Sequence, residues 1–209
     1  MLAVTGGKGG VGKTTTALGV ARALGERGVD VLAVDADRDL PDLARTAGVD
    51  TGHRVERSGS VTDGLGVSPG VDHPDWPGVR LLTLPRDRTR TRRLLDALAT
   101  RPERVVVDCP AGAGRTVAGA LRAADRSLLV TSARPASLRD GVKAAAMART
   151  LAAPPVGTAL LGRDTLGTEL HRVVSSPVID VPRVGDPLAS PAARTAYRNL
   201  SERATLRNC

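Results

Sequence analysis

The feature that most constrains this chain is a glycine- and lysine-rich stretch near its start, GGKGGVGKTT, which runs from Gly6 to Thr15. Residues 7–14 fit the phosphate-loop pattern G-x-x-x-x-G-K-[ST]. A short apolar run precedes the loop, and apolar residues at helical spacing follow it. Backbone N–H groups and the positive end of a helix hold phosphates in such loops. The sequence therefore predicts a polyphosphate site between a strand and a helix.

The rest of the chain repeats this alternation of short apolar runs and helical stretches, which is typical of a parallel sheet covered by helices. The predicted strands are Leu2–Thr5, Asp30–Val34, Val79–Leu84, Arg104–Val107, Ser127–Thr131, Val156–Leu161 and Val178–Val181. The predicted helices are Thr14–Arg27, Thr89–Thr100, Thr116–Ala123, Leu138–Leu151, Thr165–Val174 and Ala189–Arg203.

The fold class that we predict is α/β: a doubly wound, mainly parallel, seven-stranded sheet with helices on both faces. The chain has 209 residues, which suits a single domain over residues 1–209. Residues 48–78 are rich in Gly, Pro, Asp and Ser, and we predict a long surface loop there with at most one short helix.

Charge and cysteine content bear on partners and location. The 30 Lys and Arg residues exceed the 22 Asp and Glu residues by 8, which favours an anionic partner such as DNA or a membrane surface. However, Lys8, Lys13 and Lys143 are the only lysines, and such an arginine excess also fits a coding bias. The arginine run from Arg86 to Arg93 is the best candidate for an anion-binding face.

We expect a cytoplasmic protein. The chain starts directly on the phosphate-loop strand and contains no apolar run of 18 residues, so we predict neither a leader nor a transmembrane segment. Its two cysteines, Cys109 and Cys209, form no metal-type spacing and indicate no disulfide framework. The C-terminal stretch from residue 192 has few large apolar anchors, so a helix packed on the sheet is favoured over a membrane anchor.

Carboxylates follow two further predicted strands at the edge where the phosphate loop lies. Asp35 and Asp37 follow the second strand, and Asp108 ends the apolar run of residues 105–107. In phosphoryl transfer such groups hold Mg²⁺ or its water, or orient the attacking water. Lys13 is expected to reach the β- and γ-phosphates.

The Thr14 hydroxyl is expected to ligate Mg²⁺, together with Asp35 and Asp108. Gly112 can offer a backbone N–H to the γ-phosphate.

With these elements, the sequence resembles the MinD/ParA family of ATPases, whose "deviant" phosphate loop reads K-G-G-x-G-K-[ST]. The matching residues are Lys8 to Thr14, then Asp35-Ala36-Asp37, then Asp108-Cys109-Pro110-Ala111-Gly112. The D-C-P-A-G motif and the Leu138-Arg139-Asp140 turn place it nearest the MinD branch. The resemblance implies a P-loop NTPase fold with ATP and Mg²⁺ as cofactors.

In that family the early lysine, here Lys8, reaches across a nucleotide-sandwich dimer to the partner's phosphates. The resemblance thus implies an ATP-dependent homodimer in which Lys8, Lys13 and Asp37 are catalytic and Asp37 orients the attacking water. It implies slow, partner-stimulated hydrolysis, although Ala113 to Arg115 lack an acidic residue that the compared MinD proteins carry. The expected nucleotide-binding residues are Gly7, Lys8, Gly9, Gly10, Val11, Gly12, Lys13, Thr14, Thr15 and Gly112, with Arg163 and Pro182 at the adenine.

The function that the resemblance implies is a nucleotide switch in spatial positioning or partitioning, attached to a protein cargo or peripherally to a membrane or nucleoid. Two alternatives from the same superfamily stay open. One is an iron–sulfur carrier or reductase component, which needs a cysteine pair that bridges a dimer. The other is a ligase that activates a small acid.

Overall fold

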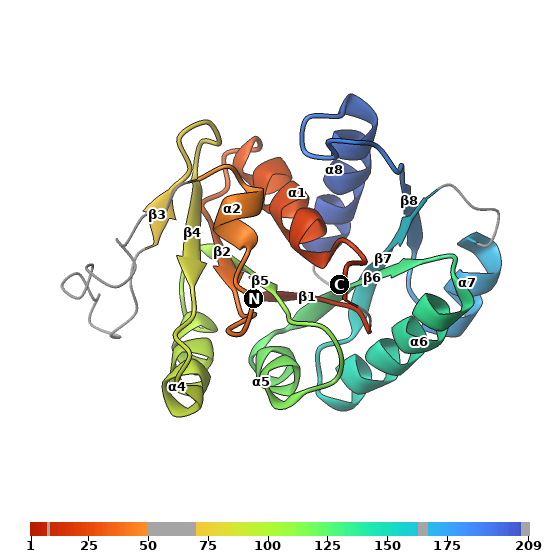
Figure 1. The fold of residues 1–209 in the computed structure, drawn as a ribbon, viewed down its shortest axis with the longest axis horizontal. Helices are drawn as coiled ribbons and strands as arrows, with labels where there is room; N and C mark the ends of the chain where they lie inside the picture. Colours follow the sequence, from red (N-terminus) through yellow and green to blue (C-terminus); the bar gives the residue numbers. More distant parts are fainter. Residues whose placement is uncertain (8, 50–69, 163–166, 206–209) are drawn as a thin grey trace.

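The computed structural model describes residues 1–7, 9–49, 70–162 and 167–205. These residues form one sheet with helices on both faces (Figure 1). The strands are β1 (Leu2–Thr5), β2 (Val31–Asp35), β3 (Val71–Asp72), β4 (Val79–Thr83), β5 (Arg104–Asp108), β6 (Arg126–Ser132), β7 (Pro155–Leu161) and β8 (Val178–Val181). The helices are α1 (Lys13–Gly25), α2 (Leu43–Thr46), α4 (Arg88–Leu98), α5 (Arg115–Ala123), α6 (Pro135–Thr150), α7 (Gly167–Val174) and α8 (Pro191–Thr205).

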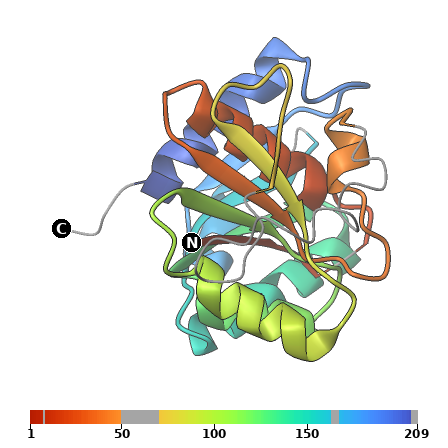
Figure 2. The same cartoon turned by 90° about the vertical axis from the view of Figure 1, so that its left-hand side faces the viewer.

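The strand order is β3-β4-β2-β5-β1-β6-β7-β8. Every neighbouring pair is parallel except β3 with β4. The central strands are buried on both faces, as parallel sheets require. Leu2 and Val4 of β1 belong to the core beneath α1 and α8, whereas Ala3 belongs to the opposite core beneath α4 and α5. Figure 2 shows α4 on one side of the sheet and α2 and α8 on the other.

The predicted fold class is confirmed, with one correction. The sheet has eight strands in the described residues, not seven, because β3 pairs antiparallel with β4. Two residues of strand in a segment without apolar alternation give no period that a sequence pattern could detect. We also expected a short helix within residues 48–78. Most of that segment, residues 50–69, lies outside the described residues.

Two further details differ from the sequence prediction. Helix α1 ends at Gly25 rather than beside Gly28, and the left-handed Gly28 (φ 76°) forms the turn three residues later. Helix α2 was not predicted, because its single turn has only Leu43 as a buried anchor.

The C-terminal helix packs on the sheet, as predicted. Tyr197 and Leu200 of α8 are buried in the core shared with α1. Among the described residues, no helix has both the length and the apolar character needed to cross a bilayer.

Two glycines within helices differ in the space available for a side chain, so replacing each with alanine should have opposite effects on stability. A Cβ on Gly19 of α1 would lie 2.3 Å from the Cδ2 atom of Tyr197, whereas a Cβ on Gly119 of α5 would meet only Leu95, at 3.6 Å. We expect Gly119→Ala to stabilise the protein by roughly 0.5–1 kcal/mol, because alanine loses less backbone entropy in a helix. Gly19→Ala should destabilise it by roughly 1–3 kcal/mol through overpacking. Urea denaturation of both variants is the measurement, and a stabilised Gly19→Ala would contradict the packing of α8 on α1.

Candidate nucleotide-binding site

The phosphate loop lies where β1 ends and α1 begins, and it is pressed against neighbouring elements. Gly12 has φ 89°, and a Cβ there would lie 2.5 Å from the side chain of Leu161 at the end of β7. A Cβ on Gly7 would lie 2.1 Å from the Cβ of Asp140 in α6. Glycine is required at Gly7 because a side chain would collide with the Cβ and backbone of Asp140, and at Gly12 because its positive φ strains other residues. The loop backbone is therefore held close to β7 and α6.

The first turn of α1 has backbone N–H groups that no side chain of the described residues caps, as in anion-binding sites at helix N-termini. Gly12 is the N-cap residue, and no side chain in the described residues caps this helix end. The first helical hydrogen bond runs from the Thr16 N–H to the Gly12 carbonyl at 2.9 Å. The amides of the first turn and the helix dipole therefore offer positive charge to an anion in the loop.

Lys13 is the first residue of α1 and is only 8% exposed. Burial lowers the pKa of its ammonium, and the nearby negative charge of Asp108 opposes this effect. A buried cation at this position gains from a polyphosphate beside it, because electrostatic attraction is stronger where water is excluded.

Asp35 and Asp108 lie side by side at the carboxyl edge of the sheet. They end the adjacent strands β2 and β5, and they are register partners. The Asp35 carboxylate accepts hydrogen bonds from the backbone N–H groups of Asp37 at 2.9 Å and Leu43 at 3.0 Å. The Asp108 carboxyl interacts with the Thr14 hydroxyl. The three residues predicted to hold Mg²⁺, Thr14, Asp35 and Asp108, thus lie together.

Burial makes the charged forms of these two carboxyls unfavourable. It raises the pKa of Asp35 to about 6, against the two backbone hydrogen bonds that lower it. It raises the pKa of Asp108 to about 7, against the interaction with the Thr14 hydroxyl, which lowers it. The Oδ1 atom of Asp108 is buried and has no hydrogen-bond partner within the described chain. A divalent cation would supply the missing positive charge and partner, so these residues fit Mg²⁺.

The structure adds one residue that sequence reasoning missed. Asp42, just before α2, accepts a hydrogen bond from the Thr14 hydroxyl at 3.2 Å. Its charge also acts on Lys13, Asp35 and Asp108. The only sequence signal was an acidic residue seven positions after Asp35, ahead of an unpredicted helical turn.

Asp37 lies in the turn that follows β2 and is half-buried. Its Oδ1 accepts hydrogen bonds from the backbone N–H groups of Asp39 at 3.3 Å and Leu40 at 3.2 Å, so one oxygen organises the turn. The next side chain, Arg38, donates to the carbonyl of Arg86 at 2.5 Å and ties this turn to the start of α4.

The remaining predicted residues are distributed around the same edge. Gly112, at φ 85°, lies in the turn after β5, and Pro182 directly follows β8. Within the loop and first turn, Gly9 and Gly10 are exposed, Val11 is buried and Thr15 is half-buried. Lys8 and Arg163 lie outside the described residues.

Comparison with known proteins identifies the family. The family model described as CbiA, the CobQ/CobB/MinD/ParA nucleotide-binding domain, matches residues 2–173. The chain belongs to this family. The predicted resemblance is therefore confirmed, and the family comprises nucleotide-binding P-loop proteins, among them the MinD/ParA ATPases.

Among relatives, the chloroplastic septum site-determining protein MinD homolog of Arabidopsis thaliana is 31% identical over 154 residues, which cover 67% of this chain and 47% of that protein. An uncharacterized ATP-binding protein of Methanocaldococcus jannaschii is 27% identical over 93% of this chain and 76% of its own length. The chain thus spans less than half of the Arabidopsis relative.

The fold recurs in solved MinD structures. MinD of Pyrococcus horikoshii, complexed with Mg-ADP, superposes with a TM-score of 0.78 at 22% identity, over 98% of this chain and 95% of that one. The Pyrococcus furiosus cell division ATPase MinD gives a TM-score of 0.76 at 24% identity, over 97% of both chains.

The raised pKa of Asp108 predicts a pH-dependent effect of its removal. The folded-state pKa of Asp108 lies above the unfolded value of 3.8, so the buried carboxyl is fully tolerated only below that pH, where it is protonated. As the pH rises through about 7 the carboxyl must ionise in its buried position, and its contribution to the free energy of unfolding is lost. We expect Asp108→Asn to stabilise the nucleotide-free protein at pH 8 by roughly 2–4 kcal/mol. The gain should shrink as the pH falls toward 4. Urea denaturation at several pH values measures it, with the exposed Asp96→Asn as control. A gain that is independent of pH would contradict this assignment.

Proposed function

We propose that this protein binds Mg-ATP at the carboxyl edge of the sheet and hydrolyses it as a nucleotide switch. The observation that supports this most directly is the convergence of Lys13, Thr14 and the Asp35–Asp108 pair beside the phosphate loop. A family member with these residues at one edge has in cis the groups that hold the phosphates and the metal ion.

Each residue has a distinct role in this proposal. The loop amides from Gly7 to Thr15 and the Gly112 N–H hold the phosphates, while Lys13 carries positive charge to the β- and γ-phosphates. Thr14, Asp35 and Asp108 would hold Mg²⁺, directly or through water, and the ion would neutralise charge on the phosphates. Asp37, whose Oδ1 holds the turn after β2, would orient the attacking water with its other carboxylate oxygen. Arg163 and Pro182 would contact adenine.

The switch involves a second copy of the chain. We propose that Lys8 supplies positive charge in trans, as an arginine finger does, so that two protomers enclose two ATP molecules. The exposure of Leu40, at 78%, supports a protein interface beside Asp37, because a large apolar side chain gains from being covered.

The cellular role that we propose is spatial positioning, with the ATP state controlling attachment to a cargo or surface. Relatives include the septum site-determining protein MinD of Synechocystis, at 28% identity, and the antiactivator FleN of Pseudomonas aeruginosa, at 30% identity. We propose a cytoplasmic protein that associates peripherally with a membrane or nucleoid, and that hydrolyses ATP slowly until a partner stimulates it.

The two alternatives differ in what they require. Cys109 is 2% exposed and burial raises the pKa of its thiol, which does not favour the iron–sulfur alternative. A small-acid ligase has a structural parallel in a cobyrinic acid a,c-diamide synthase of Mycobacterium smegmatis with bound ADP and magnesium, which shares the fold at a TM-score of 0.67 and 22% identity. Hydrolysis of ATP without any added small acid separates the switch from the ligase.

Lys13→Ala should weaken Mg-ATP binding by at least about a hundredfold, because the loop loses its buried cation in cis. Calorimetric titration with Mg-ATP is the measurement. Lys143→Ala, an exposed lysine of α6, is the matched control and should bind as the parent does. Near-parental affinity of Lys13→Ala would overturn the phosphate-loop assignment.

Asp37→Ala should bind ATP but hydrolyse it at least about a hundredfold more slowly, because orientation of water acts on the transition state. On this background, adding Lys8→Ala should abolish ATP-dependent dimers while leaving ATP binding through Lys13. Light scattering after size exclusion with ATP reports the dimer. A double variant that dimerises as its parent does would refute the trans role of Lys8, and unchanged turnover in Asp37→Ala would move the catalytic role to Asp35.

A further inference from the structure

The Asp42 side chain makes a contact that its place in the chain does not require. Asp42 is the N-cap residue of α2, and an aspartate there usually accepts a hydrogen bond from an amide of the first helical turn. The Asp42 carboxylate makes no such capping bond in the described chain. Its Oδ1 atom instead accepts a hydrogen bond from the Thr14 hydroxyl at 3.2 Å. A residue type suited to capping α2 is thus used to hold a side chain of α1.

The other contacts of Asp42 do not depend strongly on its carboxylate. The Oδ2 atom lies 3.6 Å from a guanidinium nitrogen of Arg45, whose side chain is 82% exposed. An exposed ion pair of this kind contributes little free energy. The Asp42 carbonyl accepts a hydrogen bond from the Thr46 N–H at 2.8 Å, and any residue has that carbonyl. The hydrogen bond from Thr14 is therefore the contact that a carboxylate at position 42 best explains.

The start of α2 is tied to the candidate site at a second point. The Leu43 N–H donates to the Oδ2 atom of Asp35 at 3.0 Å. The Leu43 side chain is 1% exposed and belongs to the core beneath α1. This anchor fixes the backbone beside Asp42. Residues 42 and 43 together contact two of the three side chains that are predicted to hold Mg²⁺, Thr14 and Asp35.

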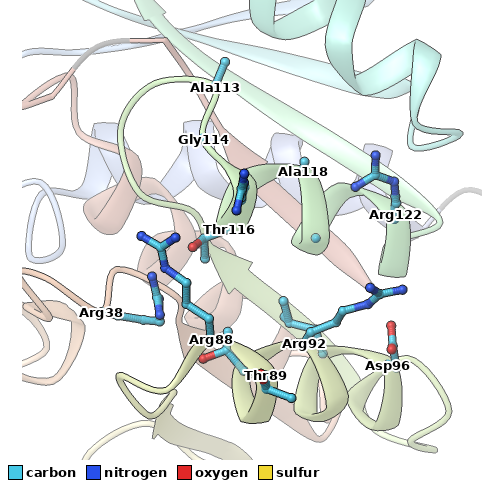
Figure 3. A pocket seen from close by; sticks show the side chains of 14 residues that line it. Arg38, Arg88, Thr89, Arg92, Asp96, Ala113, Gly114, Thr116, Ala118 and Arg122 are labelled. Carbon is cyan, nitrogen blue, oxygen red and sulfur yellow. The ribbon is translucent and has the colours of Figure 1, made fainter.

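Neighbouring side chains of the same segment lie elsewhere. Arg38 lines the cavity between α4 and α5 (Figure 3). Asp39 and Leu40 are exposed. Asp42, by contrast, reaches back to α1 through Thr14. Asp39 therefore provides a matched control, because it carries the same charge in the same segment at an exposed position.

The chemistry of a hydroxyl group explains what the contact can do. A hydroxyl has one hydrogen to donate and two lone pairs that can bind a cation. Two carboxyls lie near the Thr14 hydroxyl, those of Asp42 and Asp108. Asp108 is itself a candidate for holding Mg²⁺, and its buried Oδ1 has no hydrogen-bond partner within the described chain. If the Thr14 hydrogen goes to Asp42, the Thr14 lone pairs and the Asp108 oxygens are left for the cation.

We infer that Asp42 is a positioning residue, which takes the hydrogen of the Thr14 hydroxyl and so orients the Thr14 oxygen for Mg²⁺. This role rests on the proposed function, and Asp42 acts through Thr14 rather than on the ion itself. Removing a group that is hydrogen-bonded to a metal ligand commonly weakens metal binding by roughly tenfold to a hundredfold.

The test compares the affinity for ADP in excess Mg²⁺ with the affinity in EDTA, both by calorimetric titration. The ratio of the two affinities measures how far the metal ion strengthens nucleotide binding. We expect Asp42→Ala to lower this ratio by roughly tenfold or more. Its affinity in EDTA should be no weaker than that of the parent, because a negative charge near the phosphates is removed. An unchanged ratio, or an equal loss of affinity in both conditions, would overturn the inference.

Two further variants separate the hydrogen bond from the charge. Asp42→Asn keeps an acceptor oxygen for Thr14, so its ratio should return to within about threefold of the parent. Asp39→Ala removes the same charge from an exposed position, and its ratio should stay within about twofold of the parent. An Asp42→Asn variant as impaired as Asp42→Ala, or an equal loss in Asp39→Ala, would show an effect of charge alone and would overturn the inference.

A double-mutant cycle tests whether Asp42 acts through Thr14. Thr14→Val has a similar shape without the hydroxyl, so it should lower the ratio by itself. Adding Asp42→Ala to Thr14→Val should change the ratio by less than about twofold, because the effects of two residues that act through one contact are not additive. An undiminished effect of Asp42→Ala on the Thr14→Val background would reject action through Thr14.

The parent protein separates failure of this inference from failure of the proposed function. A parent whose ADP affinity does not respond to Mg²⁺ would overturn both. A parent that responds to Mg²⁺, together with an Asp42→Ala variant that responds equally, would overturn the role of Asp42 alone.

Discussion

Burial of the central parallel strands on both faces fixes the position of the candidate site. Strands β2, β5 and β1 lie next to one another with their carboxyl ends at one edge, so the chain must emerge there three times. Their side chains alternate between two apolar cores, and a shift of the strand register by one residue would move each side chain to the opposite core. The same register that buries Val34 and Val107 therefore places Asp35 beside Asp108.

This arrangement makes the edge of the sheet electrostatically unfavourable until a ligand arrives. Two buried carboxyls have raised pKa values, and a buried lysine has a lowered one. Each of these shifts has burial as its largest cause, so each group would gain from an opposite charge. Mg²⁺ and a polyphosphate would bring both signs of charge together. A site built in this way trades stability of the empty protein for affinity toward a charged pair.

The two turns beyond Asp35 and Asp108 face in two directions. On one side they approach the phosphate loop, through the Thr14 hydroxyl and Asp42. On the other side they lead into α4 and α5, through the Arg38 to Arg86 hydrogen bond and the start of α5 at Arg115. The same two turns therefore lie beside both the phosphate loop and the starts of α4 and α5.

The sequence by itself determined the strand–loop–helix at the start, the parallel α/β class and the identity of Lys13, Thr14, Asp35 and Asp108 as site candidates. These follow from local patterns: glycine spacing, apolar runs and carboxylates at strand ends. The packing of α8 on the sheet was also predicted, because Tyr197 and Leu200 are among too few large apolar anchors for insertion into a membrane, and both side chains are buried. Local patterns suffice wherever a residue's role depends on its own strand or helix.

Only the tertiary structure decided the rest. Asp42 joined the site because α2, a single turn, brings it to Thr14 across 28 positions of the chain. Strand β3 formed because its partner β4 supplies the hydrogen bonds that a two-residue strand cannot supply alone. The cavity between α4 and α5 is lined by arginines from three separate segments, of which the sequence marked only the run that includes Arg88 and Arg92. The contact that places Asp42 joins segments distant in sequence, and β3 is too short to show a period, so neither leaves a pattern that the sequence could reveal.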